Sequence, residues 1–301
     1  AGDRVDLSRA AGFLHAQNRF FQMDIMRREA AGELSELLGS ALLSRDRANR
    51  IHRFRDLAGR VLAGAPAEHR ANIQAYTEGV NAGLEALGAS PFEYLALRTD
   101  PEPWLAEDSV LAVLSMFLAL NDEQATRDAT LGVMRKTLPG PLFEFLATRG
   151  TEWDAPITGD AIQMPPVPGP DVFDLRQVPA TATKAARTDH AMDENPEPFT
   201  GSNNWAVSGR RTASGVALLA NDMHLGLSVP NTWYRASFVW ADTRAPGGTR
   251  RVTGVTLPGA PAIVVGSNGQ VAWGFTNSYG DRNDLIMIDK DPADPDAYQT
   301  H

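Results

Sequence analysis

The sequence lacks several features that would have pointed to common kinds of protein. It contains no cysteine, which excludes a disulfide framework, a thiolate nucleophile, zinc–thiolate sites and iron–sulfur clusters. Acidic residues outnumber basic ones, with 28 Lys and Arg against 37 Asp and Glu and a net charge of −9. Binding to a phosphate backbone depends on clustered Lys and Arg, so we expect no nucleic-acid partner. The longest apolar run, residues 110–120, is shorter than the roughly 18 residues that a membrane helix needs, and we expect no membrane insertion.

Familiar catalytic motifs are also missing. No serine lies in Gly-x-Ser-x-Gly, the nucleophile elbow of α/β-hydrolases, and none is followed three residues later by lysine. The histidines show no His-Glu-x-x-His spacing, and no glycine-rich phosphate loop of the Walker or dinucleotide type is present. The sequence therefore does not support those two serine hydrolase routes, zinc hydrolysis or nucleotide chemistry.

What the chain does contain is 43% hydrophobic residues, enough for a sizeable core, arranged with two different periods. In the first half, apolar residues recur at helical spacing. This spacing predicts one or two helices over 13–37, ended by Gly39, and further helices over 71–87 and 108–120, the last with Asp108 as its cap. We therefore predict that the first half is mainly α-helical.

The second half has a period of two, which is typical of strands. The expected strands cover 204–207, 216–220, 234–240, 262–266 and 271–276. The last two flank Asn268-Gly269, a dipeptide that accepts positive φ at both central positions of a hairpin. The second half is therefore predicted to be mainly antiparallel β, and the fold class of the whole chain α+β.

A proline-rich stretch separates the two halves. Residues 155–200 contain eight of the 20 prolines and show no periodic apolar pattern. Such a composition cannot bury enough surface to offset the entropy lost on ordering, so we interpret it as a linker or an excised spacer. It runs directly into Gly201-Ser202 and then into a predicted strand.

This junction suggests a nucleophile. If the peptide bond before Ser202 is cut, the serine gains a free α-amine with a pKa of about 7.7 to 8.0, which can act as the base for its own hydroxyl. Gly201 suits the uncut chain because a residue without Cβ tolerates the strained backbone that attack by the neighbouring hydroxyl needs. The same Gly-Ser pair is also typical of an ordinary linker end.

The residues around the junction carry a resemblance that bears on this choice. The relevant segments are Gly-Ser-Asn-Asn-Trp-Ala-Val-Ser-Gly at 201–209, Leu-Ala-Asn-Asp-Met-His at 219–224, Leu-Pro-Gly-Ala-Pro at 257–261 and Val-Ala-Trp-Gly-Phe-Thr-Asn at 271–277. They closely resemble the start of the catalytic chain of the penicillin acylase family of N-terminal-nucleophile hydrolases, which includes penicillin and acyl-homoserine lactone acylases.

The first half resembles the small chain of the same family, with its motifs in the same order. These motifs are Ala-Gln-Asn-Arg-Phe-Phe-Gln-Met-Asp at 16–24, Arg27-Arg28, Gly-Glu-Leu-Ser-Glu-Leu-Leu-Gly at 32–39 and Pro-Glu-Pro-Trp at 101–104. The resemblance implies an αββα sandwich made as one precursor, a zymogen that matures by autoproteolysis into two chains. It also implies hydrolysis of a linear amide in an acylated small molecule.

The resemblance gives the chain an expected organisation. Residues 1–155 correspond to the small-chain region with a truncated N-terminus, 156–201 to the spacer removed on maturation, and 202–301 to the start of the large chain, truncated at its C-terminus. The chain is thus expected to be a fragment whose small and large chains are partners. The asparagine side chain that completes the oxyanion hole, and its orienting arginine, are expected beyond residue 301. The resemblance further implies a periplasmic or secreted protein.

Matched residue by residue, the resemblance assigns a candidate active site. Gly201 and Ser202 flank the processed bond, and Ser202 is the nucleophile with its own amine as the base. His224 falls where some members place a histidine beside the nucleophile; a structural hydrogen-bonding histidine is the alternative. Asn277 matches the position whose backbone N–H donates to the developing oxyanion, a contribution of roughly 3 kcal/mol.

Two further sets of residues are carried over. Met116, Leu225 and Phe275 lie near family positions that line the acyl pocket, although each would also serve as ordinary core. Asp281, Asn283 and Asp284 match the family's calcium loop, and their oxygens are the ligands that Ca²⁺ prefers. A solvated acidic turn is the alternative, since an ungapped match puts Arg127 where a small-chain carboxylate is expected.

Three function hypotheses follow. The first is an amidohydrolase that removes a penicillin-type side chain or a similar acyl group through an acyl-enzyme on Ser202. The second, within the same chemistry, is an acyl-homoserine lactone acylase. The third is a catalytically silent relative that serves as a binding or structural module. Neither amide route needs an organic cofactor.

Overall fold

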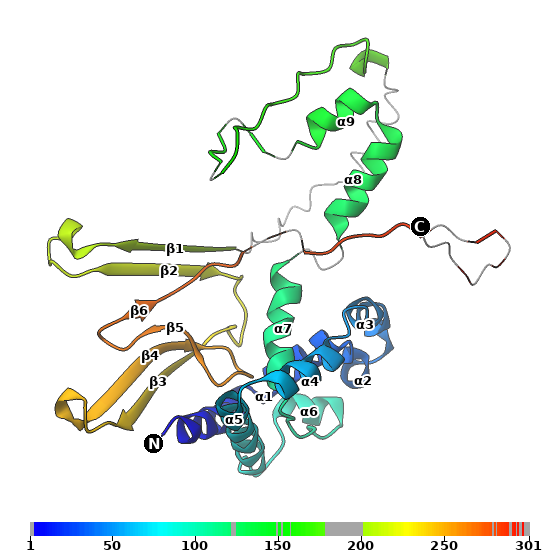
Figure 1. Cartoon of the computed structure of the whole chain (residues 1–301). Coiled ribbons are helices and arrows are strands. Elements are labelled where there is room, and N and C mark those ends of the chain that lie inside the picture. Colours follow the sequence, from blue (N-terminus) through cyan, green and yellow to red (C-terminus); the bar gives the residue numbers. More distant parts are fainter. Residues whose placement is uncertain are drawn as a thin grey trace. The chain divides into compact units, whose positions relative to one another are not determined.

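In the computed structural model the chain divides into two compact units (Figure 1). The structure describes residues 3–121, 125–148, 150–151, 153–156, 158–177, 201–278, 280, 282–288, 291–292, 294 and 297. The first unit takes in the described residues of 1–121 and 198–279, and the second those of 122–197 and 280–301. The first unit therefore joins the predicted small-chain helices to the predicted large-chain strands.

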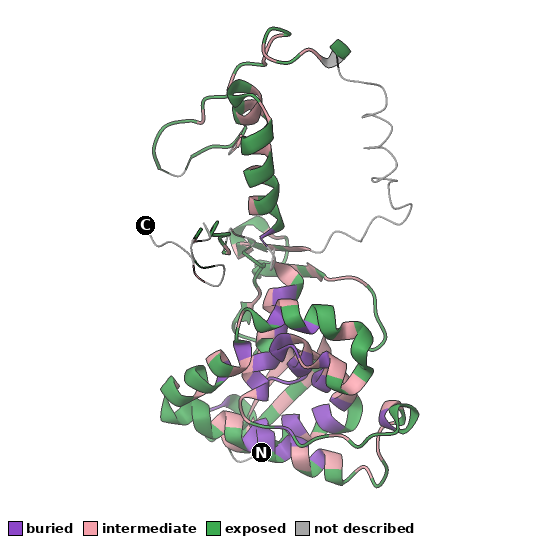
Figure 2. Ribbon diagram, turned by 90° about the vertical axis from the view of Figure 1, so that its right-hand side faces the viewer, coloured by how far each residue is buried: buried purple, intermediate pink, exposed green. Residues whose placement is uncertain are grey.

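Helices account for most of the described residues before 150. In the first unit they are α1 (Arg4–Ala31), α2 (Leu34–Leu38), α3 (Leu43–Arg50), α4 (Phe54–Gly64), α5 (Ala67–Glu85), α6 (Phe92–Leu97) and α7 (Asp108–Leu120); in the second they are α8 (Thr126–Thr137) and α9 (Gly140–Leu146). The prediction of a mainly helical first half is confirmed. Figure 2 shows the buried residues gathered in the first unit's helices, whereas α8 has no buried residue.

The strands form two antiparallel sheets, both in the first unit. One pairs β1 (Gly201–Val207) with β2 (Leu218–His224), and the other joins β3 (Tyr234–Ala241), β4 (Thr249–Thr256), β5 (Ile263–Ser267) and β6 (Ala272–Trp273) in that order. Side chains along β3 alternate strictly between intermediate and exposed, as a strand covered on one face should. The antiparallel second half and the α+β class are confirmed.

Two local predictions are wrong in detail. Asp108 does not cap α7; its Oδ2 accepts the backbone N–H of Leu105, before the helix begins, at 2.8 Å. At the hairpin between β5 and β6, Gly269 has a φ of 85°, but Asn268 is not among the positive-φ residues of the described chain. Asn268 instead holds the turn through its side chain, whose Oδ1 accepts the N–H groups of Gln270 and Val271.

About half of the predicted spacer, residues 157 and 178–200, lies outside the described residues. Residues 158–177 of the spacer run without regular elements apart from a short 3-10 turn at Leu175–Gln177, whereas its last residue, Gly201, is the first of β1. The boundaries of the small chain, spacer and large chain stay predictions.

Helices α1 and α5 approach each other closely because glycines lie at their contact. A Cβ at Gly12 would come within 2.2 Å of the Tyr76 carbonyl oxygen, and a Cβ at Gly79 within 2.0 Å of the Arg9 carbonyl oxygen. No carbon atom fits at such distances, so the two backbones touch there. A helical glycine costs about 1 kcal/mol relative to alanine, and here it permits a contact that buries Tyr76 completely against α1.

Buried polar groups join these helices to the strands. The Tyr76 hydroxyl accepts the N–H of Gly259 at 2.9 Å, so its own proton is free to donate to His15 Nδ1 at 2.7 Å. His15 Nε2 then carries the ring proton and donates to Thr256 Oγ1 at 2.9 Å, and Thr256 donates in turn to the Tyr234 carbonyl at 3.0 Å. Each donor in this series of four hydrogen bonds has one acceptor, which fixes His15 as the neutral Nε2–H tautomer.

This arrangement predicts acid sensitivity. Burial, with a smaller contribution from the charge of Arg19, lowers the pKa of His15 to about 4. Because the folded pKa lies below the unfolded value of about 6.5, the unfolded chain binds more protons between these two pH values. The contribution of neutral His15 to the free energy of unfolding is therefore fully present above about pH 6.5. It falls by about 3 kcal/mol as the pH drops to 4. Urea unfolding of the wild type and of His15→Gln across this range measures the effect. The variant should lack this component of the pH dependence, and identical pH profiles would contradict the assignment.

Candidate functional site

Ser202 is the second residue of β1, and the register of the β1–β2 sheet fixes its surroundings. Ser202 pairs with Met223, and Gly201 pairs with His224. Paired residues in an antiparallel sheet share a face, and successive residues alternate between faces. The Ser202 hydroxyl therefore lies on the Met223 face, whereas the His224 side chain lies on the other face, beside Gly201.

The Asn277 backbone lies on the hydroxyl side. Its N–H donates to Ser202 Oγ at 2.9 Å, across 75 positions of sequence. The Asn277 side-chain amide donates to the carbonyl of Leu120, at the end of α7, also at 2.9 Å. The structure thus brings together two of the three residues that the sequence assigned to catalysis, the second through the backbone group that was expected.

Asn221 of β2 also shapes this face, and the sequence interpretation missed it. Its Nδ2 donates to the carbonyls of Asn203 and Phe275, at 3.0 and 3.1 Å, and so ties the segment that leads to Asn277 onto β1. Gly274 lets the segment pass, because a Cβ there would meet Asn221 Cβ at 2.9 Å. Asn221 is part of the segment Leu-Ala-Asn-Asp-Met-His that carries the resemblance. Its position in that segment, three residues before His224, was the feature of the sequence that could have pointed to it.

The opposite face holds His224 against the bond that is predicted to be cut. A Cβ on Gly201 would come within 2.8 Å of His224 Nε2, so the imidazole occupies the space that a larger residue at 201 would need. His224 Nδ1 lies 3.2 Å from Asp222 Oδ2, and its side chain is 42% exposed. The histidine is therefore next to residue 201 and the peptide that follows it, on the face away from the hydroxyl.

The three predicted acyl-pocket residues come from three different elements. Met116 is partly buried in α7, one helical turn before Leu120, so the two lie on the same helix face. Leu225 directly follows β2 and is partly buried, and Phe275 is 54% exposed with its carbonyl held by Asn221. Their assignment to an acyl pocket stays a prediction.

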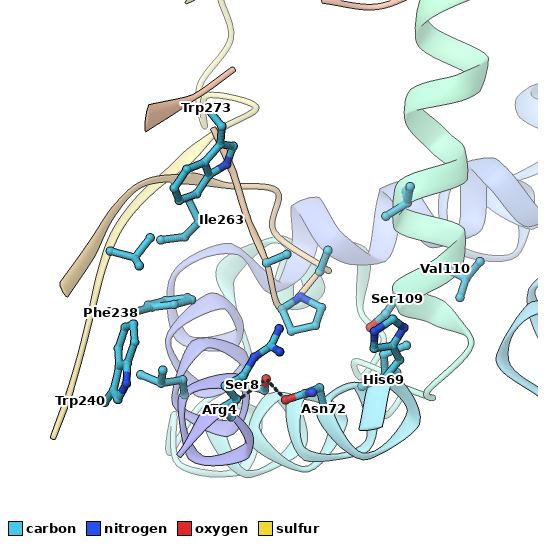
Figure 3. Close-up of a pocket in the computed structure, with 17 residues that line it drawn as sticks. Arg4, Ser8, His69, Asn72, Ser109, Val110, Phe238, Trp240, Ile263 and Trp273 are labelled. Carbon is cyan, nitrogen blue, oxygen red and sulfur yellow. Dashed lines mark hydrogen bonds between the residues drawn. The ribbon is translucent and has the colours of Figure 1, made fainter. Parts of the chain in front are cut away.

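An apolar groove lies elsewhere in the first unit (Figure 3). It has a volume of about 730 Å³ and is walled on one side by Phe238, Trp240, Ile263 and Trp273 of the four-stranded sheet, and on the other by residues of α1, α5 and α7 that include Val110. None of the predicted catalytic or acyl-pocket residues lines it. The groove is therefore separate from the Ser202 site.

The calcium prediction falls partly outside the described residues, because Asp281 is not among them. Asn283 is partly buried and Asp284 is exposed in the second unit. Within the described part of the chain, no three His, Asp or Glu side chains gather to hold a metal, whereas Ca²⁺ takes six to eight oxygens. These two residues do not make a calcium site by themselves, and calcium stays a prediction.

Comparison with known proteins agrees with the motifs. The family described as penicillin amidase matches residues 1–301. The chain belongs to the penicillin amidase family. Among its relatives, the acyl-homoserine lactone acylase QuiP of Pseudomonas aeruginosa is 31% identical over 92% of this chain. The penicillin acylase 2 proenzyme of Pseudomonas sp. is 28% identical over 95% of it, and penicillin G acylase of Escherichia coli is 22% identical over 100%.

This penicillin amidase family chain spans about a third of the length of the curated relatives it matches, covering 31%, 35% and 40% of these three. A solved structure of the thermostable penicillin G acylase from Alcaligenes faecalis is similar over 54% of this chain and 91% of the other, with 27% identity and a TM-score of 0.45. Among the helices that the structure describes, none is both long and apolar enough to cross a membrane.

Proposed function

We propose that the protein is an amidohydrolase that matures by autoproteolysis and cleaves acylated small molecules through an acyl-enzyme on Ser202. The observation that carries this proposal is the 2.9 Å hydrogen bond from the Asn277 backbone N–H to Ser202 Oγ. This bond places the N–H next to the nucleophile, and we propose that during attack it passes to the carbonyl oxygen of the substrate, where a donor stabilises the developing negative charge. Membership of the penicillin amidase family and the names of the relatives support the same chemistry.

Maturation would begin in the uncut chain. Ser202 Oγ attacks the carbonyl carbon of Gly201, the Gly201–Ser202 amide bond breaks, and the acyl group moves to oxygen as an ester. Water then cleaves the ester, leaving Gly201 as a carboxylate and Ser202 with a free α-amine. Gly201 suits this step because a residue without Cβ tolerates the strained backbone that attack by the neighbouring hydroxyl needs.

Turnover would then use the new N-terminus. The α-amine takes the hydroxyl proton as Ser202 Oγ attacks the substrate amide, and the oxyanion accepts the Asn277 N–H. The intermediate collapses as the amine leaves with the proton from the α-ammonium, and water activated by the same amine hydrolyses the ester. We assign His224 to the amine side of the serine, since it faces residue 201 rather than the hydroxyl.

The substrate proposal is a phenylacetyl-type or similar acyl amide, as in penicillins. Release of phenylacetate from its amides should then exceed release of straight-chain acyl groups from homoserine lactones by roughly 10-fold or more in kcat/KM. The second candidate, an acyl-homoserine lactone acylase, is favoured by the higher identity of the QuiP relative. A reversed preference, measured on the full-length protein with both substrate series, would replace the first candidate by the second.

Processing tests the proposal against a catalytically silent relative. The full-length protein should run as two chains on a denaturing gel. A single uncut band without amidase activity would favour the silent module.

We further propose a periplasmic or secreted location, on the family resemblance. We also propose a calcium loop at 281–284, which 45Ca²⁺ binding to the wild type and to Asp284→Asn would test.

A further inference from the structure

The side chain of Asn277 makes a contact that the proposed oxyanion donor does not itself require. Its Nδ2 donates to the carbonyl of Leu120 at 2.9 Å. Leu120 is the last residue of α7, and the last four carbonyls of a helix have no N–H partner within the helix. The amide therefore satisfies a carbonyl at the negative end of the helix dipole, where a donor is favoured.

The two donors of Asn277 are held by two different elements. The backbone N–H meets Ser202 in β1, while the side chain is fixed to α7. The segment that leads to Asn277 is fixed as well, because the Asn221 side chain in β2 donates to the carbonyl of Phe275 at 3.1 Å. The peptide group that carries the Asn277 N–H thus lies between two anchors, and removing either one frees it to rotate.

We infer that Asn277 is a positioning residue: the hydrogen bond of its side chain to the end of α7 holds its backbone N–H beside Ser202 Oγ, within reach of the oxyanion that forms there. The inference rests on the proposed function, since it needs the N–H to serve as the oxyanion donor. It also gives α7 a part in catalysis: the helix that belongs to the predicted small chain fixes a donor that belongs to the predicted large chain.

The chain offers a test in which the donor itself is untouched, because substitution at 277 leaves the backbone N–H in place. In the full-length protein, Asn277→Ala should lower kcat by about 10- to 100-fold, since an error of about 1 Å in positioning costs up to roughly 100-fold. KM should change little, because the interaction acts in the transition state. Asn277→Asp should lose as much at pH 8, where a carboxylate cannot donate. Its kcat relative to the wild type should begin to recover only as the pH falls toward the ordinary carboxyl pKa of about 3.9, where the acid regains a proton to donate.

Asn121 provides the matched control. It lies beside the same helix end, but its Nδ2 donates to the Phe117 carbonyl within that turn, at 3.1 Å. Asn121→Ala should keep kcat and KM. If Asn277→Asp retains the wild-type kcat at pH 8, or if Asn277→Ala changes KM alone, the inference is wrong. These results differ from a failure of the proposed function, which would appear as unchanged processing and turnover in Ser202→Ala.

Discussion

Replacing Ser202 with alanine in the full-length protein should abolish both processing and amide hydrolysis. The two losses share one cause, because the same hydroxyl would attack Gly201 during maturation and the substrate during turnover. Removal of a nucleophile from a coupled set typically costs about 10⁶-fold in kcat, so no turnover should be measurable. A denaturing gel and a release assay with a phenylacetyl amide read the two effects separately.

Two further variants make this result specific. Ser202→Cys should still process, since a thiol can perform the acyl shift, but should lose most amide hydrolysis. Ser214→Ala, which alters an exposed serine in the turn between β1 and β2, should process and turn over as the wild type does. Normal processing in Ser202→Ala would remove Ser202 from the mechanism.

The second large effect is expected in stability, at Asp24. This carboxylate is completely buried in α1, where it accepts bonds from Arg27 Nε at 2.7 Å, Arg28 Nε at 2.9 Å and the Tyr94 hydroxyl at 2.6 Å. Burial disfavours the charged form of the Arg27 guanidinium, yet the carboxylates of Asp24 and Asp108 hold the pKa of Arg27 above its ordinary value. Asp24→Ala would leave buried donors without their acceptor, and it should lower the free energy of unfolding by about 3–5 kcal/mol.

Urea unfolding followed by tryptophan fluorescence suits this measurement, because the Trp104 ring lies 5.2 Å from the Arg27 guanidinium. The exposed pair between Arg60 and Asp56 in α4 supplies the control. Asp56→Ala should cost less than about 1 kcal/mol, as exposed ion pairs do. Equal losses in the two variants would contradict the view that burial decides the effect.

Periodicity predicted the elements well where packing and pattern agree. The limits of α7 match the expected range, and β3 follows its alternation. The sequence did not reveal β4, in which Gly254 breaks the apolar pattern, yet the strand needs that glycine because a Cβ there would come within 2.0 Å of the Val265 carbonyl oxygen. A close contact of this kind depends on the neighbouring strand and is not visible in a local window.

The candidate site shows the same division. The resemblance pointed to Ser202 and to the Asn277 backbone, and the structure brings them within hydrogen-bonding distance. It could not show that His224 lies on the opposite face from the hydroxyl, which follows from the register of two strands. Nor could it give a role to the Asn277 side chain, whose acceptor on Leu120 is 157 positions away. The sequence marked Arg27 and Arg28 only as a family motif. The structure shows that both pair with the buried carboxylate of Asp24.

N-terminal sequencing of the native full-length enzyme, after its chains are separated, tests the central claim most directly. If a backbone cut creates the catalytic amine, the larger chain must begin Ser-Asn-Asn-Trp, with Ser202 first. A larger chain that starts at any other residue, or an active enzyme that remains one uncut chain, would contradict the account.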